Sequence, residues 1–205
     1  ALELAQLLSL VSVHKTDLIR DETQLAALTD SVLRPRVAEG RPLMVWSAGC
    51  STGEEVATLL MLLAESGAHP GSRVLGSDLS PTALKEARAL TFSEPVLRRV
   101  PPTLLSRYFL SSRGDDARRA LIPSLSERAR FMQHNLVDWP YPFAEGGGLF
   151  DVIVCRNVLI YFTAEAARLT VQHFVERLRP GGVLVLSAAE PLLEPVAELS
   201  TLKQR

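Results

Sequence analysis

The sequence predicts an α/β fold in which helices cover a central, mostly parallel β-sheet. Short apolar runs bounded by turn residues indicate buried strands at residues 43–48, 73–77, 150–155 and 183–187. Segments with apolar side chains at helical spacing come between them, at about residues 54–66, 80–90 and 164–178. Because strands that alternate with helices pair in parallel through right-handed crossovers, this order indicates one layered sheet.

The helices in this pattern have recognisable starts and ends. The first one ends at Gly67, because glycine commonly occupies the position just after a helix. Ser80 and Pro81 start the next one, since serine caps a helix and proline suits its first turn. These signals support the predicted element order.

An N-terminal helical segment is predicted ahead of the first strand. Residues 1–12 and 23–37 are apolar at helical spacing, and the second of these follows Asp21. We therefore divide the chain into an N-terminal segment at residues 1–40 and a main domain at residues 41–205.

A different pattern occupies residues 107–134. Short apolar runs alternate there with polar turns, which favours a small antiparallel β insertion in the main domain. The last of these runs is predicted to be a strand of the main sheet that leads to Asn135. A short helix is expected at residues 103–109, and residues 198–205 resemble a further strand.

Composition excludes several classes of protein. With 205 residues, 47% hydrophobic residues and a net charge of −1, the chain can bury a core, and its charge balance gives no support to nucleic-acid binding, which usually needs a strongly basic face. Its apolar stretches are far shorter than the roughly 18 residues that a membrane span needs. Its two cysteines form neither a disulfide framework nor a zinc site. We expect a cytoplasmic monomer that neither binds nucleic acid nor inserts into membranes.

The most informative stretch is WSAGCSTGEE at residues 46–55. It predicts a strand, a tight glycine turn and a helix start that carries Glu54 and Glu55. Bare backbone amides at a helix start would attract a pyrophosphate. Two carboxylates there instead suit a ligand with a cationic amino-acid end and no phosphate, and S-adenosylmethionine fits that description.

Other polar residues follow the neighbouring strands. Ligands of open α/β sheets bind outside the carboxyl ends of the strands, near the point where the strand order reverses. Asp78 follows the second strand, where an acid commonly binds ribose hydroxyls. The turn lacks one glycine of the G-x-G-x-x-G pattern expected for NAD, and it lacks the Lys-Ser/Thr of a P-loop. From these residues alone, a nucleoside cofactor is predicted but its identity stays open.

Several blocks together resemble one known family. WSAGCSTGEE at residues 46–55, GSDLS at 76–80, RYF at 107–109 and CRNVLIYF at 155–162 closely resemble the motifs of CheR-type chemotaxis receptor methyltransferases. HKTDLIR at residues 14–20 is similar to that family's N-x-T-x-F-F-R motif. The resemblance covers about residues 13–200, with the blocks in the same order.

The resemblance implies a Rossmann-like methyltransferase fold, S-adenosylmethionine as cofactor, and the cytoplasmic part of methyl-accepting chemoreceptors as partner. It implies the following cofactor-binding residues: His14, Thr16, Arg20, Gly49, Glu55, Asp78, Asn135, Leu136, Asn157 and Val158. Within this set Glu55 would bind the methionyl ammonium, Asp78 the ribose, and Asn135 with Leu136 the adenine. Arg20 and Tyr161 would lie near the transferred methyl group as catalytic residues.

The implied reaction moves a methyl group from sulfonium to a glutamate side chain. Because a glutamate with a pKa of about 4.3 is already ionised at pH 7, no general base is needed. Two alternatives stay open at this point. One is a regulatory module that binds the cofactor without transferring its methyl group, since His14 replaces the family's asparagine. The other is methyl transfer to a small-molecule acceptor.

Overall fold

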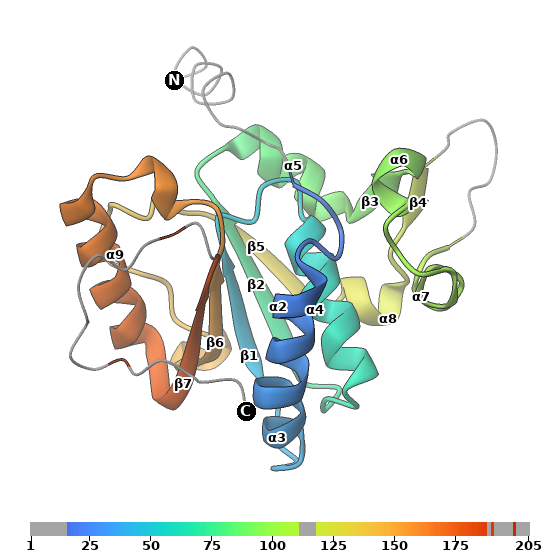
Figure 1. Cartoon of the computed structure of the whole chain (residues 1–205), viewed down its shortest axis with the longest axis horizontal. Helices are drawn as coiled ribbons and strands as arrows, with labels where there is room; N and C mark the ends of the chain where they lie inside the picture. Colours follow the sequence, from blue (N-terminus) through green and yellow to red (C-terminus); the bar gives the residue numbers. More distant parts are fainter. Residues whose placement is uncertain (1–15, 111–117, 188–189, 191–198, 200–205) are drawn as a thin grey trace.

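The structure is a computed structural model of the chain, and it describes residues 16–110, 118–187, 190 and 199 (Figure 1). The predicted helix at residues 1–12 and the predicted site residue His14 lie outside these residues. Of the predicted strand at residues 198–205, only residue 199 is described. No helix in the described ranges is both long and apolar enough to cross a membrane.

The central sheet has five parallel strands in the order β5-β2-β1-β6-β7. Their bounds are Met44–Ala48 for β1, Arg73–Asp78 for β2, Ala129–Gln133 for β5, Phe150–Cys155 for β6 and Leu178–Leu186 for β7. The chain builds outward from β1 through β2 to β5, then returns to the other side of β1 through β6 and β7. The strand order therefore reverses between β1 and β6, which confirms the α/β, Rossmann-like class and marks the expected ligand edge.

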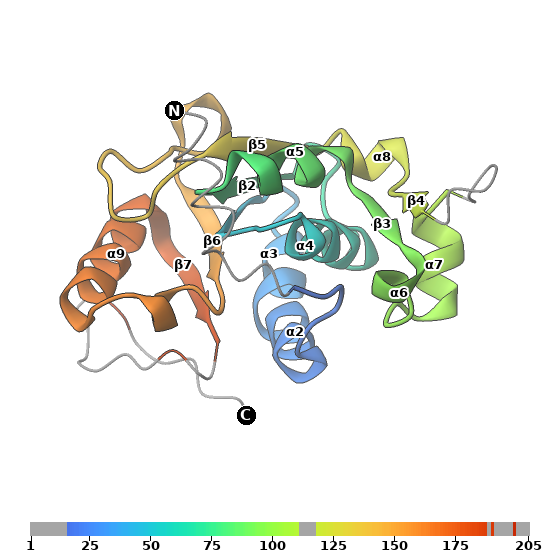
Figure 2. The same ribbon diagram turned by 90° about the horizontal axis from the view of Figure 1, so that it is seen from above.

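Helices cover both faces of this sheet (Figure 2). On one face lies α4, Glu54–Glu65, together with an N-terminal helix that consists of α2, Glu22–Leu28, a π-helical turn, Thr29–Leu33, and α3, Arg34–Val37. On the other face lies α9, Ala164–Arg177. The helix α5, Pro81–Ala89, connects β2 to the insertion. The predicted helices at residues 23–37, 54–66, 80–90 and 164–178 are thus present.

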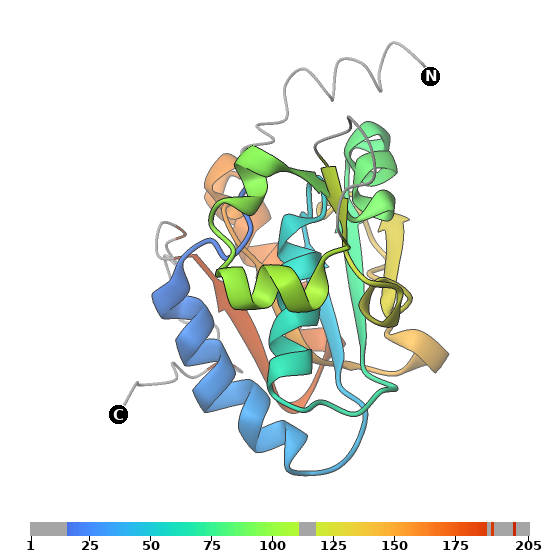
Figure 3. The same ribbon diagram turned by 90° about the vertical axis from the view of Figure 1, so that its right-hand side faces the viewer.

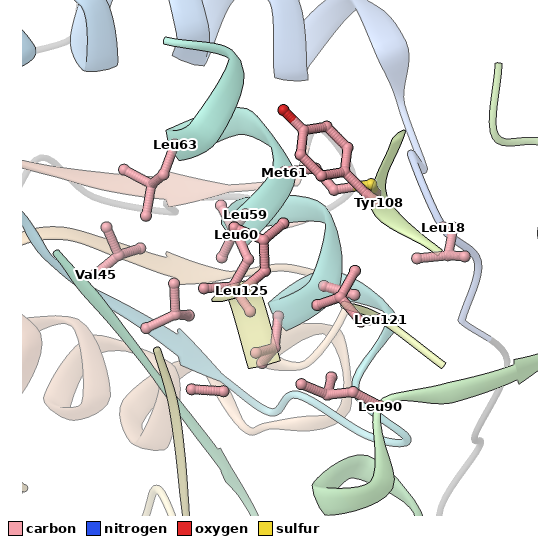
Figure 4. Close-up of a cluster of buried hydrophobic side chains, with 14 of the residues drawn as sticks. Leu18, Val45, Leu59, Leu60, Met61, Leu63, Leu90, Tyr108, Leu121 and Leu125 are labelled. Carbon is pink, nitrogen blue, oxygen red and sulfur yellow. The ribbon is translucent and has the colours of Figure 1, made fainter. Parts of the chain in front are cut away.

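Helix α4 is enclosed by apolar side chains on nearly all sides. Leu59, Leu60 and Leu63 are at most 1% exposed and belong to the cluster that contains Val45 of β1 (Figure 4). Met61 is equally buried in this cluster, which also includes side chains of the insertion. A helix that is apolar around its whole circumference belongs in the interior. Its N-terminal end, which carries Glu54 and Glu55, is therefore firmly positioned.

The second core cluster lies on the opposite face of the sheet and is rich in aromatic residues. Trp46 of β1 is fully buried there against Phe150 and Phe174, with ring centroids 5.4 and 5.2 Å away. The indole Nε1 of Trp46 donates a hydrogen bond to Ser77 Oγ, 2.9 Å away on β2. This bond satisfies the only polar atom of the Trp46 side chain.

The antiparallel insertion differs in detail from its prediction. One of its two described strands is β3, Thr91–Ser93, which pairs with β4, Arg118–Ala120, and so begins before residue 107. Phe109 and Leu121 extend this pairing by one isolated bridge. Three residues directly after a helix are too few to show an alternating pattern, which explains why β3 was not predicted.

Short helices complete the insertion on the side of the molecule away from α9 (Figures 1 and 3). They are α6 at Glu94–Leu97, α7 at Pro102–Tyr108 and α8 at Pro123–Ser126. The expected helix at residues 103–109 corresponds to α7. Two short 3₁₀ turns, Glu145–Gly147 and Leu159–Tyr161, flank β6.

Candidate active site

The glycine turn after β1 lies against the loop after β6. The backbone N–H groups of Gly49 and Cys50 both donate to Ser77 O on β2, at 2.8 and 2.9 Å. Gly49 has φ = 84°, and a Cβ placed on it would lie 2.5 Å from Val158 Cγ2. Glycine is required here both for its backbone conformation and for the close approach of Val158. Two predicted site residues are thereby brought into contact.

The two acids at the start of α4 have different environments. Glu54 is buried and accepts a hydrogen bond from Thr52 Oγ1, so it stabilises the turn. Glu55 is 16% exposed, accepts a 2.7 Å hydrogen bond from Ser47 Oγ, and lies 3.7 Å from Arg156 Nη1. Glu55 is therefore the acid that lies beside a charged residue of the site, Arg156.

Burial strongly affects the carboxyl group of Glu55. Desolvation raises its pKa to about 7, although the guanidinium of Arg156 and the charge of Arg20 act to lower it. Glu190 adds a negative charge nearby that raises this pKa further. The positive charge around Glu55 is thus too small to compensate for its burial. An additional cation at this point would be stabilised.

Asp78 joins the ends of two neighbouring elements. Its Oδ2 accepts a 2.8 Å hydrogen bond from Ser51 N in the glycine turn, and its Oδ1 accepts one from Ser80 N, 2.9 Å away. Each carboxylate oxygen has two acceptor positions, so both oxygens keep capacity for a further donor. The carboxylate is partly exposed at the end of β2, which is compatible with its predicted contact to ribose hydroxyls.

The loop after β5 is fixed by hydrogen bonds to its backbone. Leu136 is 7% exposed, and its carbonyl oxygen accepts hydrogen bonds from the Tyr141 hydroxyl and from Thr170 Oγ1 on α9. Asn135 Oδ1 accepts a 3.3 Å hydrogen bond from Val137 N, so its amide group is oriented within the loop. The two residues predicted beside adenine therefore form a constrained loop at the edge of the sheet.

Glu190 is a structural residue of the site that was not predicted. Its carboxylate is 7% exposed and accepts hydrogen bonds from Val158 N at 2.7 Å, Leu159 N at 2.9 Å and Ser187 N at 2.7 Å. Asn157, whose φ is 60°, precedes these residues and donates to Ser187 Oγ at 3.4 Å. In the sequence, the pattern Ser187-x-x-Glu190 has the spacing of a capping box, and this spacing could have indicated that Glu190 accepts hydrogen bonds from nearby backbone N–H groups.

Replacing Glu190 by glutamine should destabilise the chain. An amide has one acceptor oxygen in place of two and would turn an N–H group toward the backbone donors. We expect the free energy of unfolding to fall by about 2–3 kcal/mol. Urea denaturation measures this, with Glu176→Gln on the exposed side of α9 as control, which should change stability by less than about 0.5 kcal/mol. Equal stability of the two variants would contradict the assignment.

The segment at residues 16–20 reaches the same edge of the sheet. Ile19 N donates a 3.1 Å hydrogen bond to Thr58 Oγ1 on α4, and Arg20 O accepts one from Arg156 Nη2 at 2.7 Å. Thr16 is partly buried at the start of this segment. These bonds bring Arg20 to the edge of the sheet that carries Glu55.

Tyr161 is the most exposed of the predicted site residues that the structure describes. Its side chain, on the short turn that follows Val158, is 63% exposed. Its backbone N–H donates to Val158 O at 3.1 Å, which fixes the turn but leaves the phenol at the surface. Tyr161 therefore adjoins the site at its outer rim.

The residues at this edge of the sheet have the chemistry that is needed to bind S-adenosylmethionine. Glu55 is an incompletely compensated buried carboxylate, and an ammonium group would supply the missing positive charge. Asp78 keeps acceptor capacity for hydroxyl groups, and the missing side chain of Gly49 lets Val158 pack directly against the glycine turn. The site thus provides complementary chemistry for an amino-acid end and a ribose.

The comparisons with known proteins identify the family of the chain. The family model for "CheR methyltransferase, SAM binding domain" matches residues 14–205. A chemotaxis protein methyltransferase of Listeria monocytogenes is 36% identical over 197 residues, which cover 95% of this chain and 72% of that protein. A chemotaxis protein methyltransferase 2 of Vibrio cholerae is 33% identical over 195 residues, covering 93% of this chain and 66% of that protein.

A longer protein is also similar. An uncharacterized 104.1 kDa protein of Rhodobacter capsulatus is 34% identical over 210 residues, which cover 99% of this chain. The chain spans only 21% of that relative's length. The match of the family model over almost the whole chain confirms the resemblance seen in the motifs. The chain belongs to the CheR family of methyltransferases and comprises its S-adenosylmethionine-binding domain.

Proposed function

We propose that the chain transfers a methyl group from S-adenosylmethionine to glutamate side chains in the cytoplasmic part of methyl-accepting chemoreceptors. The products are a glutamate methyl ester and S-adenosylhomocysteine. The observation that carries this proposal is the buried Glu55, which lies beside Arg156 at the carboxyl edge of the sheet and lacks full charge compensation. The similarity to proteins named chemotaxis protein methyltransferase supports the choice of acceptor.

The chemistry needs alignment rather than proton transfer. The bound cofactor supplies an electrophilic methyl group on a positively charged sulfur. An oxygen of the acceptor carboxylate forms the new bond to the methyl carbon while the carbon–sulfur bond breaks and its electron pair stays on sulfur. The acceptor carboxylate is ionised at pH 7, so no residue has to remove a proton.

The proposed roles are those that the family resemblance implies for these residues. Glu55 binds the ammonium group and Asp78 binds the ribose, which fixes the cofactor at two points. Arg20 orients the incoming carboxylate through a two-pronged contact, and Tyr161 lies at the rim where an acceptor arrives. Holding the reactants in line can lower the barrier by about 7–11 kcal/mol in favourable cases.

Labelled methyl donor tests this proposal. The chain is incubated with S-adenosylmethionine that carries a radioactive methyl group and with membranes that contain chemoreceptors. We expect label on the receptor that is released as methanol by mild base, as methyl esters are. Stable label on a small molecule would instead identify a different acceptor. Binding of S-adenosylhomocysteine without any label would identify a regulatory module.

Arg20→Ala should reduce turnover more than it reduces cofactor affinity. The guanidinium contacts the acceptor during the reaction, so its loss should lower kcat by about 100-fold or more. The affinity for S-adenosylhomocysteine should change by less than about 5-fold, a small part of the binding free energy. Label transfer and calorimetry measure the two effects, and Arg20→Lys should recover part of kcat. A larger effect on affinity than on kcat would reassign Arg20 to cofactor binding.

A further inference from the structure

A cavity at the opposite end of the strands from the candidate active site has no part in the function proposed above. It lies where β2 and β5 begin, whereas Glu55 and Asp78 lie at the carboxyl edge of the sheet. Its volume is about 770 Å³, and none of the predicted site residues lines it. Small-molecule sites in proteins typically have volumes of about 300–1,000 Å³. The cavity is therefore large enough for a small organic ligand.

The lining of this cavity carries an excess of positive charge. Arg73, Arg128 and Arg130 line it, and Glu127 is the acid among the described residues that do so. Glu145 lies 3.4 Å from Arg73 Nε and 3.9 Å from Arg130 Nη2, so its single charge is shared between two arginines. Three positive charges against these two negative charges leave a net charge of +1. We call this feature the arginine cavity.

Arg128 is the arginine of this cavity whose charge is least compensated. Its Nε and Nη2 donate hydrogen bonds to the backbone oxygens of Ser72 and His69, at 3.0 and 3.3 Å, and no described carboxylate forms an ion pair with it. Burial and the positive charge of Arg73 both lower the pKa of Arg128. A guanidinium has five N–H donors, so Arg128 keeps donors for a further acceptor. An anion placed beside it would relieve the unfavourable interaction with Arg73.

Other parts of the lining are apolar. Leu125 and Tyr108 line the arginine cavity and belong to the core cluster that surrounds α4 (Figure 4), and Pro70 and Ala64 line it as well. The Tyr108 hydroxyl donates to Glu65 Oε1, which fixes the orientation of the phenol. A ligand that matches this lining has a strongly anionic group at one end and an apolar part at the other.

A phosphate monoester has the anionic group that suits three arginines. It carries a charge of about −1.5 to −2 at pH 7 and has three strong acceptor oxygens, whereas a carboxylate has one charge and two oxygens. Arginine binds phosphate through two parallel hydrogen bonds from its planar guanidinium. The excess of positive charge and the free donors of Arg128 therefore favour a phosphate over a carboxylate.

We propose that the arginine cavity binds a small organic phosphate, with the phosphate group on the three arginines and the remainder of the ligand against the apolar lining. This site is separate from the one that is assigned to S-adenosylmethionine, and no residue of the cavity has a role in the proposed methyl transfer. The inference is therefore independent of the proposed function and can be tested without a methyl acceptor.

Phenyl phosphate is the probe, because it combines a phosphate group with an apolar ring. Calorimetry with the whole chain at pH 7.5 and about 150 mM salt, where weak surface attraction is screened, should give a Kd below about 1 mM. Inorganic phosphate, which lacks the ring, and benzoate, which has a carboxylate in place of the phosphate, should each bind at least about 10-fold more weakly. Saturation of the chain with S-adenosylhomocysteine should leave the binding of phenyl phosphate unchanged.

Variants of the arginines test the location of this site. Arg128→Gln should weaken phenyl phosphate binding by about 10-fold or more, as expected for a charge-assisted contact. Because Arg128 also supports the loop at residues 69–72, Arg130→Gln is the second variant. Arg130 is 54% exposed and its Nη1 donates to two backbone oxygens of its own segment, so this variant should fold normally and bind about 3- to 10-fold more weakly. Arg34→Gln, at a 64% exposed position of α3, is the control and should bind as the unaltered chain does.

Urea denaturation shows whether each variant is folded, and Arg130→Gln decides the question if Arg128→Gln is not. Unchanged affinity in the folded variants would overturn the inference, as would benzoate or inorganic phosphate binding as tightly as phenyl phosphate. Displacement of phenyl phosphate by S-adenosylhomocysteine would place the probe in the cofactor site and would also overturn it. The absence of binding to the unaltered chain would have the same meaning, and none of these results would affect the proposed methyl transfer.

Discussion

A Gly49→Ala chain should bind S-adenosylhomocysteine at least about 100-fold more weakly than the unaltered chain. The added Cβ would lie 2.5 Å from Val158 Cγ2, and valine has little rotamer freedom with which to move away. The loops after β1 and β6 must then separate, and both are predicted to contact the cofactor. Alanine at φ = 84° adds backbone strain. We expect the free energy of unfolding to fall by about 2–4 kcal/mol from the strain and the overpacking.

A matched control separates these two effects. Gly40 has φ = 73°, and a Cβ added there would have no described atom within 4 Å, so Gly40→Ala introduces the strain without the contact. It should retain full affinity and lose only about 1 kcal/mol of stability. The double variant Gly49→Ala/Val158→Ala should recover part of the lost affinity, because the crowded methyl group is gone. Calorimetry and urea denaturation measure both quantities, and unchanged affinity in Gly49→Ala would refute the proposed contact.

Glu55→Gln should weaken S-adenosylhomocysteine binding by about 10- to 100-fold at pH 7.5 and should remove its pH dependence between pH 5.5 and 7.5. The magnitude is that of one charge-assisted contact. The pKa of Glu55 is raised to about 7 by burial, so the carboxyl group is largely protonated below that pH. Only the ionised form attracts an ammonium group. The affinity of the unaltered chain should therefore rise with pH and level off above pH 7, by up to about tenfold per pH unit.

The stability of the free chain should depend on pH in the opposite direction. Because the pKa of Glu55 in the folded chain lies above its usual value of 4.5, the folded chain retains a proton that the unfolded chain has lost. The contribution of Glu55 to stability is therefore lost as the pH rises from about 4.5 to about 7.

The matched control for the affinity measurement is Glu54→Gln. Glu54 is hydrogen-bonded to Thr52, so this variant should leave the affinity and its pH dependence unchanged. A pH-independent affinity of the unaltered chain would contradict the role of Glu55.

The parts of the molecule that the sequence predicted are those determined by local pattern. The strands β1, β2 and β6 each contain a short apolar run, and β6 is buried along its whole length, as is typical of parallel strands covered on both faces. The positions of Glu55 and Asp78 at the carboxyl edge of the sheet could be predicted because each residue directly follows a predicted strand or turn. Even the choice between Glu54 and Glu55 followed from the resemblance rather than from the pattern, since both acids occupy the same helix start.

The parts that could not be predicted depend on contacts between distant positions. Arg156 and Arg20 are 136 positions apart, and Glu190 lies 32 positions beyond Val158. No periodicity relates such residues, so an isolated charge in an apolar sequence gives no indication of its partner. The strand β3 was missed because its three residues are too few to show an alternating pattern, and its pairing partner β4 follows only after two intervening helices.

The enclosure of α4 within the apolar core has a consequence for how this domain can diverge. The acidic start of α4 is continuous with the interior packing, to which side chains of the insertion also contribute, whereas Tyr161 lies at the exposed rim. Segments at the rim can therefore change in sequence, and so accept a methyl group onto a different substrate, without weakening the binding of the nucleoside. Binding of the methyl donor therefore depends on residues that are part of the core packing. The choice of methyl acceptor depends on residues at the rim, which are free to change.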